Sequence, residues 1–324
     1  MTLRVGVIGT GVMGADHVRT LREDTSGAAL VAVCDADAAR AQAVAGGAAA
    51  FTDPLALIRD DRVQAVIIAS PDATHADLAL ACIAAGKPVL CEKPLAPTAE
   101  DALRVVEAEV DRGRRLVQVG YMRRFDPAYV EMKRTSDAGQ IGDPVLLHNT
   151  HRNAAAPDWF TGAMAVTNSF VHEIDISRWL LGCEFTFATV QAAPGGDPLM
   201  ITMTGEAGQI VSTEVFMNAR YGYHVHAQLV GRDGTVEMAA PTAVLTNRAG
   251  HHGHPWAENW VPRFRDAYRI QMNAWVRSIA DGQPVGASAW DGYVATAIAE
   301  EVVTALQTGT PARLSLRGRP ALYA

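Results

Sequence analysis

A glycine turn near the start of the chain, Gly9-Thr10-Gly11-Val12-Met13-Gly14, limits the possible folds more than any other feature. Residues 3–9 (LRVGVIG) are typical of a buried parallel strand, and a helix is expected from about Gly11 to Arg22. The first glycine allows a tight turn, the second lets the backbone approach a pyrophosphate, and the third lets the helix pack on the strand. The first helical turn, with Val12 and Met13, attracts phosphate charge. We therefore expect a dinucleotide-binding α/β domain.

The residues up to Tyr121 alternate between strand and helix patterns with short connections. Further strands are expected at 29–35, 63–70, 88–92 and 116–121, and helices at 37–45, 53–60, 73–85 and 98–112. This alternation is typical of a doubly wound parallel sheet. Residues 1–121 are therefore predicted to form a Rossmann domain.

Asp35 ends the second expected strand, where an acid can accept hydrogen bonds from the adenosine ribose hydroxyls. A carboxylate there would also repel the additional phosphate of NADP, and no arginine follows it directly. The sequence therefore favours NAD over NADP as the cofactor.

The rest of the chain, residues 122–324, has a different pattern. Helices are expected at 125–135, 169–181, 262–281 and 289–307, and a strand at 145–152. Between 185 and 245, short alternating runs are separated by glycine turns, as in an antiparallel sheet. We expect a C-terminal α/β domain with a large, mainly antiparallel open sheet and a late helix that can pack back on the first domain.

Lys93 follows the fourth expected strand, in Cys91-Glu92-Lys93-Pro94. Ligands of open α/β sheets lie at the carboxyl ends of the strands, so this lysine is expected near the nicotinamide. Close to that positive charge it would lose basicity and could take part in proton transfer. The alternative for Lys93 by itself is a solvated surface lysine.

Composition excludes several classes of function. The net charge of −7 disfavours nucleic acid as a partner, and no apolar run has the length of a membrane span. Four cysteines without CxxC spacing, and a first strand that begins at once without a signal peptide, indicate free thiols in a reducing cytoplasm. No carboxylate or cysteine completes a helical zinc pattern with His251, His252 and His254, so we expect a flexible loop there and no metal.

Several motifs together carry a resemblance that covers nearly the whole chain. They are Gly9–Gly14, Ser70-Pro71-Asp72-x-x-His75, Glu92-Lys93-Pro94 and Asn168-x-x-x-His172-x-x-Asp175. With them the chain resembles the superfamily of glucose–fructose oxidoreductase, inositol dehydrogenase and rhizopine catabolism proteins (Gfo/Idh/MocA). Residues 120–127, 148–152, 218–223 and 288–293 make it most similar to the bacterial inositol 2-dehydrogenases. The resemblance implies a homotetramer formed through the open sheet, and a polyol or sugar bound between the domains.

The resemblance also implies roles for individual residues. Lys93 matches the catalytic lysine, and His172 matches the catalytic histidine that takes the proton of the reacting hydroxyl. The motifs also place Ser70, Pro71, His75 and Glu92 at the cofactor, and Arg123, Asn149, His151, Tyr221 and Tyr223 at the polyol. Asp175 is expected to be structural.

Asn168 departs from the family pattern, which has aspartate at this position. On an α-helix, residues four apart share a face, so Asn168 should still meet His172. Its carbonyl oxygen could hold the imidazole in one tautomer, but it supplies no charge to stabilise the protonated ring. Either Asn168 serves a modified relay, or the substrate and activity differ from inositol oxidation.

The expected activity is NAD-dependent oxidation of a secondary hydroxyl of a cyclitol, with myo-inositol 2-dehydrogenase as the leading hypothesis. A dehydrogenase of scyllo-inositol, an amino-cyclitol or a hexose is the first alternative. A non-catalytic NAD-binding regulator and a redox-assisted elimination or hydrolysis also remain open.

Overall fold

The structure, a computed structural model, describes residues 2–239 and 244–324 of the 324-residue chain. The chain divides into two compact units. The first contains the residues up to Met122 together with Ala267–Ala297 and Leu316–Ala324, and the second contains Arg123–Asp266 and Ile298–Ser315. Helices α10 (Arg265–Asp281) and α11 (Ala289–Thr308) each pass from one unit to the other.

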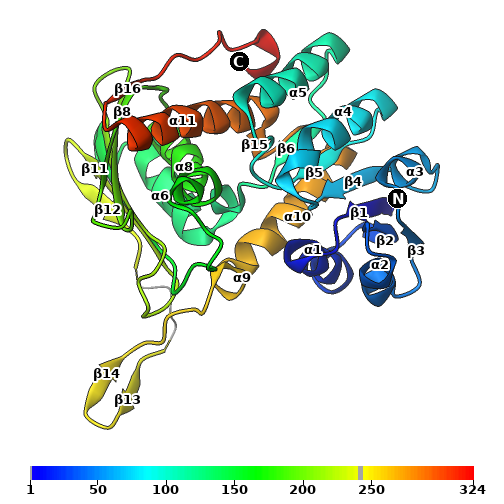
Figure 1. The fold of residues 1–324 in the computed structure, drawn as a ribbon, viewed down its shortest axis with the longest axis horizontal. Coiled ribbons are helices and arrows are strands. Elements are labelled where there is room, and N and C mark those ends of the chain that lie inside the picture. Colours follow the sequence, from blue (N-terminus) through cyan, green and yellow to red (C-terminus); the bar gives the residue numbers. More distant parts are fainter. Residues whose placement is uncertain (1, 240–243) are drawn as a thin grey trace. The chain divides into compact units, whose positions relative to one another are not determined.

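A seven-stranded sheet forms the centre of the first unit, in the order β15-β6-β5-β4-β1-β2-β3 (Figure 1). All neighbouring strands are parallel except β15, which pairs antiparallel with β6. The strands are β1 (Leu3–Ile8), β2 (Ala28–Cys34), β3 (Ala49–Phe51), β4 (Ala65–Ile68), β5 (Val89–Cys91), β6 (Val117–Val119) and β15 (Ala287–Ser288). The predicted Rossmann sheet is confirmed.

Helices cover both faces of this sheet. On one face, α1 (Val12–Glu23), α2 (Ala38–Ala45) and α10 bury apolar side chains against alternate residues of the strands, in one continuous core. On the other face lie α3 (Pro54–Arg59), α4 (His75–Ala85) and α5 (Ala99–Arg112). Gly6 of β1 leaves the space that Leu57 of α3 fills on that face.

Short local signals set the ends of these helices. The side chains of Asp37, Asp53 and Thr98 accept hydrogen bonds from the first backbone amides of α2, α3 and α5. Gly86 and Gly113 end α4 and α5 in the left-handed conformation. The strands β3 and β15 were not expected, because segments of two or three residues are too short to show a period of two.

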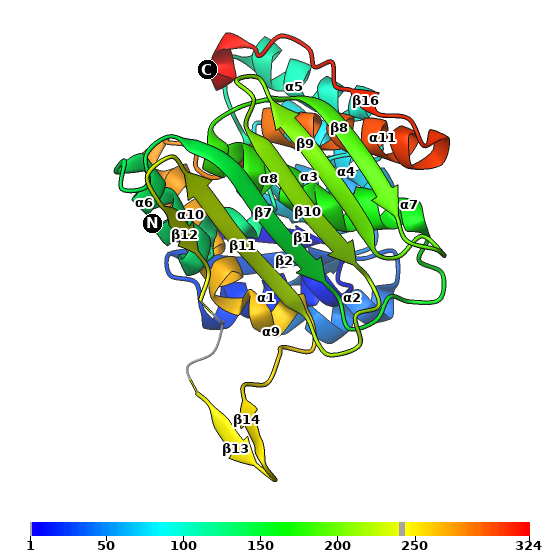
Figure 2. The same cartoon turned by 90° about the vertical axis from the view of Figure 1, so that its left-hand side faces the viewer.

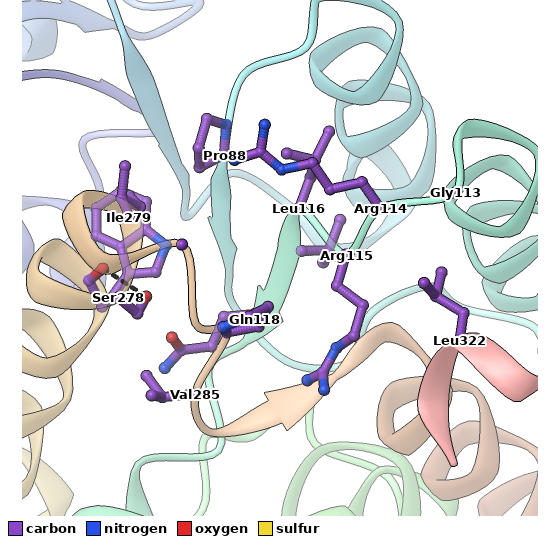
Figure 3. A pocket seen from close by; sticks show the side chains of 14 residues that line it. Pro88, Gly113, Arg114, Arg115, Leu116, Gln118, Ser278, Ile279, Val285 and Leu322 are labelled. Atoms are coloured by element: carbon purple, nitrogen blue, oxygen red, sulfur yellow. Dashed lines mark hydrogen bonds between the residues drawn. The ribbon is translucent and has the colours of Figure 1, made fainter.

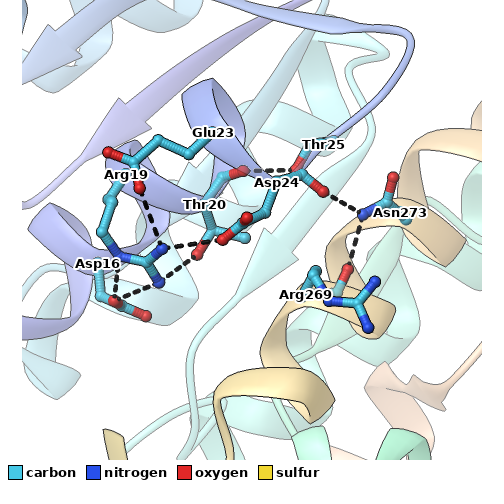
Figure 4. Close-up of polar contacts among 8 residues, drawn as sticks. All are labelled: Asp16, Arg19, Thr20, Glu23, Asp24, Thr25, Arg269 and Asn273. Atoms are coloured by element: carbon cyan, nitrogen blue, oxygen red, sulfur yellow. Dashed lines mark hydrogen bonds and ion pairs between the residues drawn. The ribbon is translucent and has the colours of Figure 1, made fainter. Parts of the chain in front are cut away.

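A distant asparagine joins α10 to the loop after α1 (Figure 4). Asn273 Nδ2 donates to the carbonyl oxygens of Asp24, 2.8 Å away, and Arg269, 2.9 Å away. Asn273 Oδ1 accepts from the backbone amide of Ser26 at 3.1 Å. The loop at the end of α1 is therefore held by a side chain that the sequence places far along the chain.

A second seven-stranded sheet, in the order β12-β11-β7-β10-β9-β8-β16, belongs to the second unit (Figure 2). Only β10 and β7 pair in parallel, so the mainly antiparallel sheet is confirmed. One face is covered by helices, and the other faces the viewer in Figure 2 without a covering layer from this unit. The strands are β7 (Pro144–Arg152), β8 (Phe185–Ala192), β9 (Leu199–Gly205), β10 (Ile210–Phe216), β11 (His224–Gly231), β12 (Thr235–Glu237) and β16 (Ala312–Arg313).

The helices of the second unit differ in detail from the expectation. The helix expected from Phe125 begins at Pro127, because Pro127 occupies the first helical position, and Met122–Phe125 form a separate 3₁₀ turn. The helix expected from Ser169 begins as a π-helical turn, Ala165–Phe170, before α8 (Val171–Leu181). The remaining helices are α6 (Pro127–Asp137), α7 (Gly162–Met164) and α9 (Trp260–Arg263).

The expected flexible loop around His251 is wrong in part. Strands β13 (Thr246–Arg248) and β14 (His251–Gly253) form a two-stranded hairpin there, with a turn at Ala249 and Gly250. Both turn residues have positive φ, which lets a short hairpin close. The end of the expected antiparallel region, residues 240–243, lies outside the described residues.

No helix in the described part of the chain is both long enough and apolar enough to cross a membrane.

The packing of α10 generates a prediction about stability. Met272 is 1% exposed in the core of the first sheet. Replacing it by alanine, Met272→Ala, should lower the free energy of unfolding by about 2–5 kcal/mol, because it leaves a cavity. Chemical denaturation would measure this. The exposed Arg277→Ala on the same helix should change it by less than about 0.5 kcal/mol, and equal effects would contradict the packing assigned to α10.

Candidate active site

The three glycines of the first turn have three different environments. Gly9 has a φ of 86°, and a Cβ there would overlap the backbone of Ala69. A Cβ on Gly14 would overlap the carbonyl oxygen of Gly9, so α1 approaches the turn only because this residue has no side chain. At Gly11 a Cβ would meet nothing within 4 Å. The backbone of Gly11 is therefore open to a ligand at the N-terminus of α1.

A cavity of about 760 Å³ adjoins this turn. Of the residues assigned to the cofactor from sequence, it is lined by Gly9, Gly11, Asp35, Ser70 and Pro71. The cavity, the open backbone at Gly11 and the N-terminus of the twelve-residue α1 suit a dinucleotide with an anionic centre. Val12 is 72% exposed at that N-terminus, so the turn is accessible.

Asp35 does more than the sequence suggested. One carboxylate oxygen accepts from the amide and the hydroxyl of Thr10, both at 2.9 Å, and the other accepts from the amide of Asp37 at 2.9 Å. Burial alone would raise the pKa of Asp35, but these hydrogen bonds and the charge of Arg40 hold it below its ordinary value. Asp35 is therefore an anion that also tethers the glycine turn.

Arg40 was missed in the sequence. Its guanidinium lies 3.1 Å from Asp35 Oδ1 and lines the same cavity. No arginine follows Asp35 directly, but the first turn of α2 brings Arg40, five positions later, back to it. Arg40 could bind the 2′-phosphate of NADP, but it is paired with Asp35, whose carboxylate would repel that phosphate.

Glu92 joins three elements at the carboxyl end of the first sheet. Its Oε1 lies 2.8 Å from His17 Nε2 of α1, and its Oε2 accepts from the amide of Lys93 at 3.3 Å. A Cβ on Gly120, after β6, would lie 2.9 Å from the same carboxylate. Burial would raise the pKa of Glu92, but His17 and Lys93 hold it below its ordinary value. His17 was not expected here, since no motif marked it.

Lys93 and His75 occupy the adjacent loop. The peptide bond between Lys93 and Pro94 is cis. His75 is buried, with Nδ1 2.7 Å from the carbonyl oxygen of Pro94 and Nε2 2.8 Å from that of Ser70. The imidazole of His75 thus joins the Ser70 loop to the Lys93 loop, rather than lining the cavity itself.

In the second unit, a buried polar group lies between the sheet and α8. Arg123 forms an ion pair with Glu173, and both side chains are at most 1% exposed. His151 Nδ1 lies 3.0 Å from Glu173, and Tyr223 Oη lies 3.5 Å from the other nitrogen of the ring. Three of the four residues were expected at the polyol, and Glu173 was not, although it directly follows His172.

The charges of this group follow from its burial. Burial would raise the pKa of Glu173, but Arg123 and His151 hold it below its ordinary value, so it is an anion. Nδ1 of His151 lies 3.0 Å from Glu173 and 3.2 Å from Nη2 of Arg123, so the ring contacts both members of the ion pair. Burial raises the pKa of Tyr223 to about 12, so its hydroxyl keeps its proton. The group therefore places a neutral hydroxyl, that of Tyr223, beside the imidazole of His151.

Asn149 lies two residues before His151 on the same face of β7. Its Nδ2 donates to Ser177 Oγ at 3.1 Å and Thr213 Oγ1 at 3.4 Å. Its buried Oδ1 has no hydrogen-bond partner within the described residues, so one strong acceptor remains for a ligand or water.

Asn168 and His172 belong to different kinds of helix. Asn168 lies in the π-helical turn and His172, 7% exposed, in the first turn of α8. The argument from α-helical spacing therefore does not apply between them, because a π turn has i→i+5 hydrogen bonds. Asn168 Oδ1 accepts from Thr167 Oγ1 at 2.8 Å. Asp175 pairs with Arg124 at 2.6 Å, which fits its expected structural part.

Tyr221 is not brought to this group. It is 44% exposed, and its hydroxyl lies 3.0 Å from Arg152 Nη1 and 2.6 Å from His224 Nδ1. Arg152 follows His151 on β7, so it points to the other face of the sheet. Tyr221 thus contacts Arg152 and Tyr223 contacts His151, although the two tyrosines are only two positions apart. They precede β11, and Gly222 between them has a φ of 137°, so the chain is not a regular strand there and a period of two does not apply.

Among residues 2–239 and 244–324, no group of three or more His, Cys, Asp or Glu side chains is arranged to hold a metal ion.

The pair of Asp35 and Arg40 generates a prediction about cofactor selectivity. In Asp35→Ser, the carboxylate that repels a 2′-phosphate is gone and Arg40 is released to bind one. We expect the ratio of the Kd values for NADPH and NADH to fall by about tenfold or more. Fluorescence titration of the two reduced cofactors would measure this ratio.

Two further variants separate the causes. Arg40→Gln in the Asp35→Ser background should remove the gain in NADPH affinity. Asp53→Asn removes another carboxylate that lines the same cavity. If it shifts the ratio as far as Asp35→Ser does, the selectivity comes from overall charge and not from this pair.

Known proteins are similar to this chain over its full length. A protein named inositol 2-dehydrogenase 1 from Saccharopolyspora erythraea is 53% identical, covering 100% of this chain and 99% of the relative. One named inositol 2-dehydrogenase from Paracoccus denitrificans is 41% identical, covering 100% of each. The crystal structure of myo-inositol dehydrogenase from Lactobacillus casei in complex with NAD(H) and myo-inositol matches with a TM-score of 0.96, 30% identity and 100% coverage of both chains.

Both units also match known families of domains. Residues 3–121 match the oxidoreductase family with an NAD-binding Rossmann fold, and residues 129–237 match the GFO/IDH/MocA C-terminal domain. The cofactor of this chain is therefore NAD, as the glycine turn and Asp35 predicted. The chain belongs to the GFO/IDH/MocA family of NAD-dependent oxidoreductases.

Proposed function

We propose that this protein oxidises a secondary hydroxyl of a cyclitol with NAD, and that it is a myo-inositol 2-dehydrogenase. The observation that carries the proposal is the 53% identity, over the whole chain, to a relative named inositol 2-dehydrogenase. The buried donor and acceptor groups of the second unit support it, because a polyol needs both at neighbouring hydroxyls.

The first unit supplies the residues that would hold the cofactor. The open backbone at Gly11 and the first turn of α1 would receive the pyrophosphate, and Asp35 would receive the adenosine ribose. NAD, when bound, accepts a hydride from the carbon that carries the reacting hydroxyl. Glu92, through His17 and the amide of Lys93, would fix the loop that carries the lysine.

We assign the proton of the reacting hydroxyl to His172, as the general base. Lys93 would polarise the hydroxyl oxygen with its ammonium group and stabilise negative charge as the proton leaves. Asn168, with its amide oriented by Thr167, would take the place of the family aspartate without adding a charge.

We assign the orientation of the polyol to His151 and Tyr223, with Asn149 as a further acceptor. Arg123 and Glu173 would act as positioning residues, since they are buried and bound to each other. Tyr221 lies on the other sheet face with Arg152 and is left out of this assignment.

Asn168 favours a second candidate. Asn168 adds no negative charge where the family has an aspartate, which favours either another substrate, such as scyllo-inositol, an amino-cyclitol or a hexose, or a non-catalytic NAD-binding regulator. We also propose a homotetramer in the cytoplasm. The uncovered face of the second sheet supports the oligomer, and the four free thiols support a reducing compartment.

The function is tested by NADH formation from NAD with a panel of cyclitols, hexoses and one glycoside. Oxidation of myo-inositol with the highest kcat/KM in the panel is the expected result. Preference for another member would transfer the assignment to that substrate. NAD binding without turnover would favour the regulator, and glycoside cleavage without net NADH would favour redox-assisted elimination or hydrolysis.

The lysine is tested by Lys93→Met, which keeps the length of the side chain and removes its charge. We expect kcat to fall by about 10²–10⁴-fold, because a positioned proton-transfer group is lost. The Kd of NADH should stay close to that of the wild type. Lys133→Met, on α6, removes a different lysine and should leave kcat unchanged. Near-normal turnover of Lys93→Met would refute the catalytic role.

Asn168 is tested by a substitution that should raise activity, because it restores the family aspartate. If His172 is the base, Asn168→Asp places an anion near the imidazolium and should raise kcat at neutral pH by about tenfold or more. Steady-state rates with the preferred substrate would measure this, and Asn168→Leu should lower kcat. A loss of activity in Asn168→Asp would instead show that the amide itself is needed.

A further inference from the structure

A second cavity of the first unit, of about 380 Å³, has no part in the proposed reaction (Figure 3). Pro88 and Leu116 line it, directly before β5 and β6. It therefore lies at the amino ends of these strands, whereas the cofactor cavity lies at the carboxyl ends of β1, β2 and β4. Trp275, Ser278 and Ile279 of α10 form its opposite wall.

Gln118 of β6 is the clearest sign that this cavity takes a ligand. Its side chain lines the cavity near Ser278 and Val285 in Figure 3, and it is only 4% exposed. Neither Oε1 nor Nε2 has a hydrogen-bond partner in the described part of the chain. A buried amide that leaves a donor and an acceptor unused is costly, so such groups normally bind a ligand or water.

Two arginines give the same cavity a positive charge. Arg114 and Arg115 both line it, and neither has a carboxylate within ion-pair distance among the described residues. The buried Nε of Arg115 has no hydrogen-bond partner in that part of the chain, and its guanidinium carbon lies 5.8 Å from the centre of the Tyr323 ring.

The nearest acid does not neutralise these arginines by direct contact. Glu109 accepts hydrogen bonds from the amides of Leu116 and Val117 and from the Tyr323 hydroxyl, the last at 2.6 Å. Burial raises the pKa of Glu109, which weakens its negative charge further. The positive field of Arg114 and Arg115 is therefore available to a ligand.

A comparison within the same unit shows that arginines beside a hollow need not be available. Arg4 and Arg22 line another depression, but Arg4 Nε donates to the carbonyl oxygen of Arg62 at 2.6 Å, and Arg22 donates to that of Ala45. Those guanidinium groups are already used in hydrogen bonds to backbone carbonyl oxygens. Arg114 and Arg115 make no such hydrogen bond within residues 2–239 and 244–324.

We propose that this cavity binds a small organic anion. A carboxylate or phosphate would lie against Arg115 and Arg114, which bind such groups through charge-assisted hydrogen bonds. A second polar atom of the ligand would pair with the Gln118 amide. The body of the ligand would be apolar, because most of the remaining lining is apolar, with Leu116, Trp275, Ile279, Val285 and Leu322.

The experiment uses the full-length protein saturated with NADH, so that the phosphate site at Gly11 is already occupied. Benzoate and phenyl phosphate serve as anionic probes and benzyl alcohol as the neutral one, with binding followed by ligand-observed NMR. We expect saturable binding of at least one anion, about tenfold tighter than the neutral probe. Preference between the two anions identifies the charged group.

Variants locate the binding. Arg115→Gln and Gln118→Leu should each weaken binding of the preferred probe by about tenfold, since each removes a polar partner. Arg134→Gln, an exposed arginine of α6, should leave it unchanged. The Kd of NADH reports whether each variant is folded. If Gln118→Leu does not fold, Arg115→Gln alone decides.

Three results would overturn the proposal. The first is that neither anion binds saturably up to about 10 mM. The second is that benzyl alcohol binds as tightly as the anions. The third is that Arg115→Gln binds the preferred anion as tightly as the wild type does. None of these outcomes bears on inositol oxidation, which is measured separately, so the two proposals can fail independently.

Discussion

The close approach of α1 to the glycine turn is the contact on which the first unit depends. Gly14 can lie against the carbonyl of Gly9 only because it has no Cβ, and that contact sets the direction of the helix. Its N-terminus then points to the cofactor cavity, and its second turn carries His17 to Glu92. One steric constraint therefore fixes both the phosphate site and the anchor of the lysine loop.

Buried polar groups in this protein divide into those that are fully satisfied and those that are not. Asp35, Glu92 and Glu173 each accept several hydrogen bonds or ion pairs and remain anions despite their burial. Asn149 and Gln118 keep unused atoms within the described residues. The satisfied groups hold backbone and side chains in position, while the unused ones mark places where a ligand gains hydrogen bonds without displacing existing ones.

The second unit uses the sheet pleat to separate two sets of side chains. His151 faces α8 with Glu173 and Arg123, whereas Arg152 faces the uncovered side with Tyr221 and Glu214. The inner set is desolvated, so the charge of Glu173 is held by its neighbours Arg123 and His151. The outer set is accessible, and its ion pair is weaker because water screens it.

The sequence by itself determined the Rossmann sheet, the mainly antiparallel second sheet and the NAD turn, since these follow from local periods and from glycines within six residues. It also predicted Lys93 and His151 as site residues, because short motifs carry them. Only the tertiary structure decided that Arg40 lies on Asp35, that His17 holds Glu92, that Glu173 pairs with Arg123, and that Tyr221 and Tyr223 face opposite ways. These contacts join residues through helix direction and sheet pleat, and their energies depend on burial, which no local pattern records.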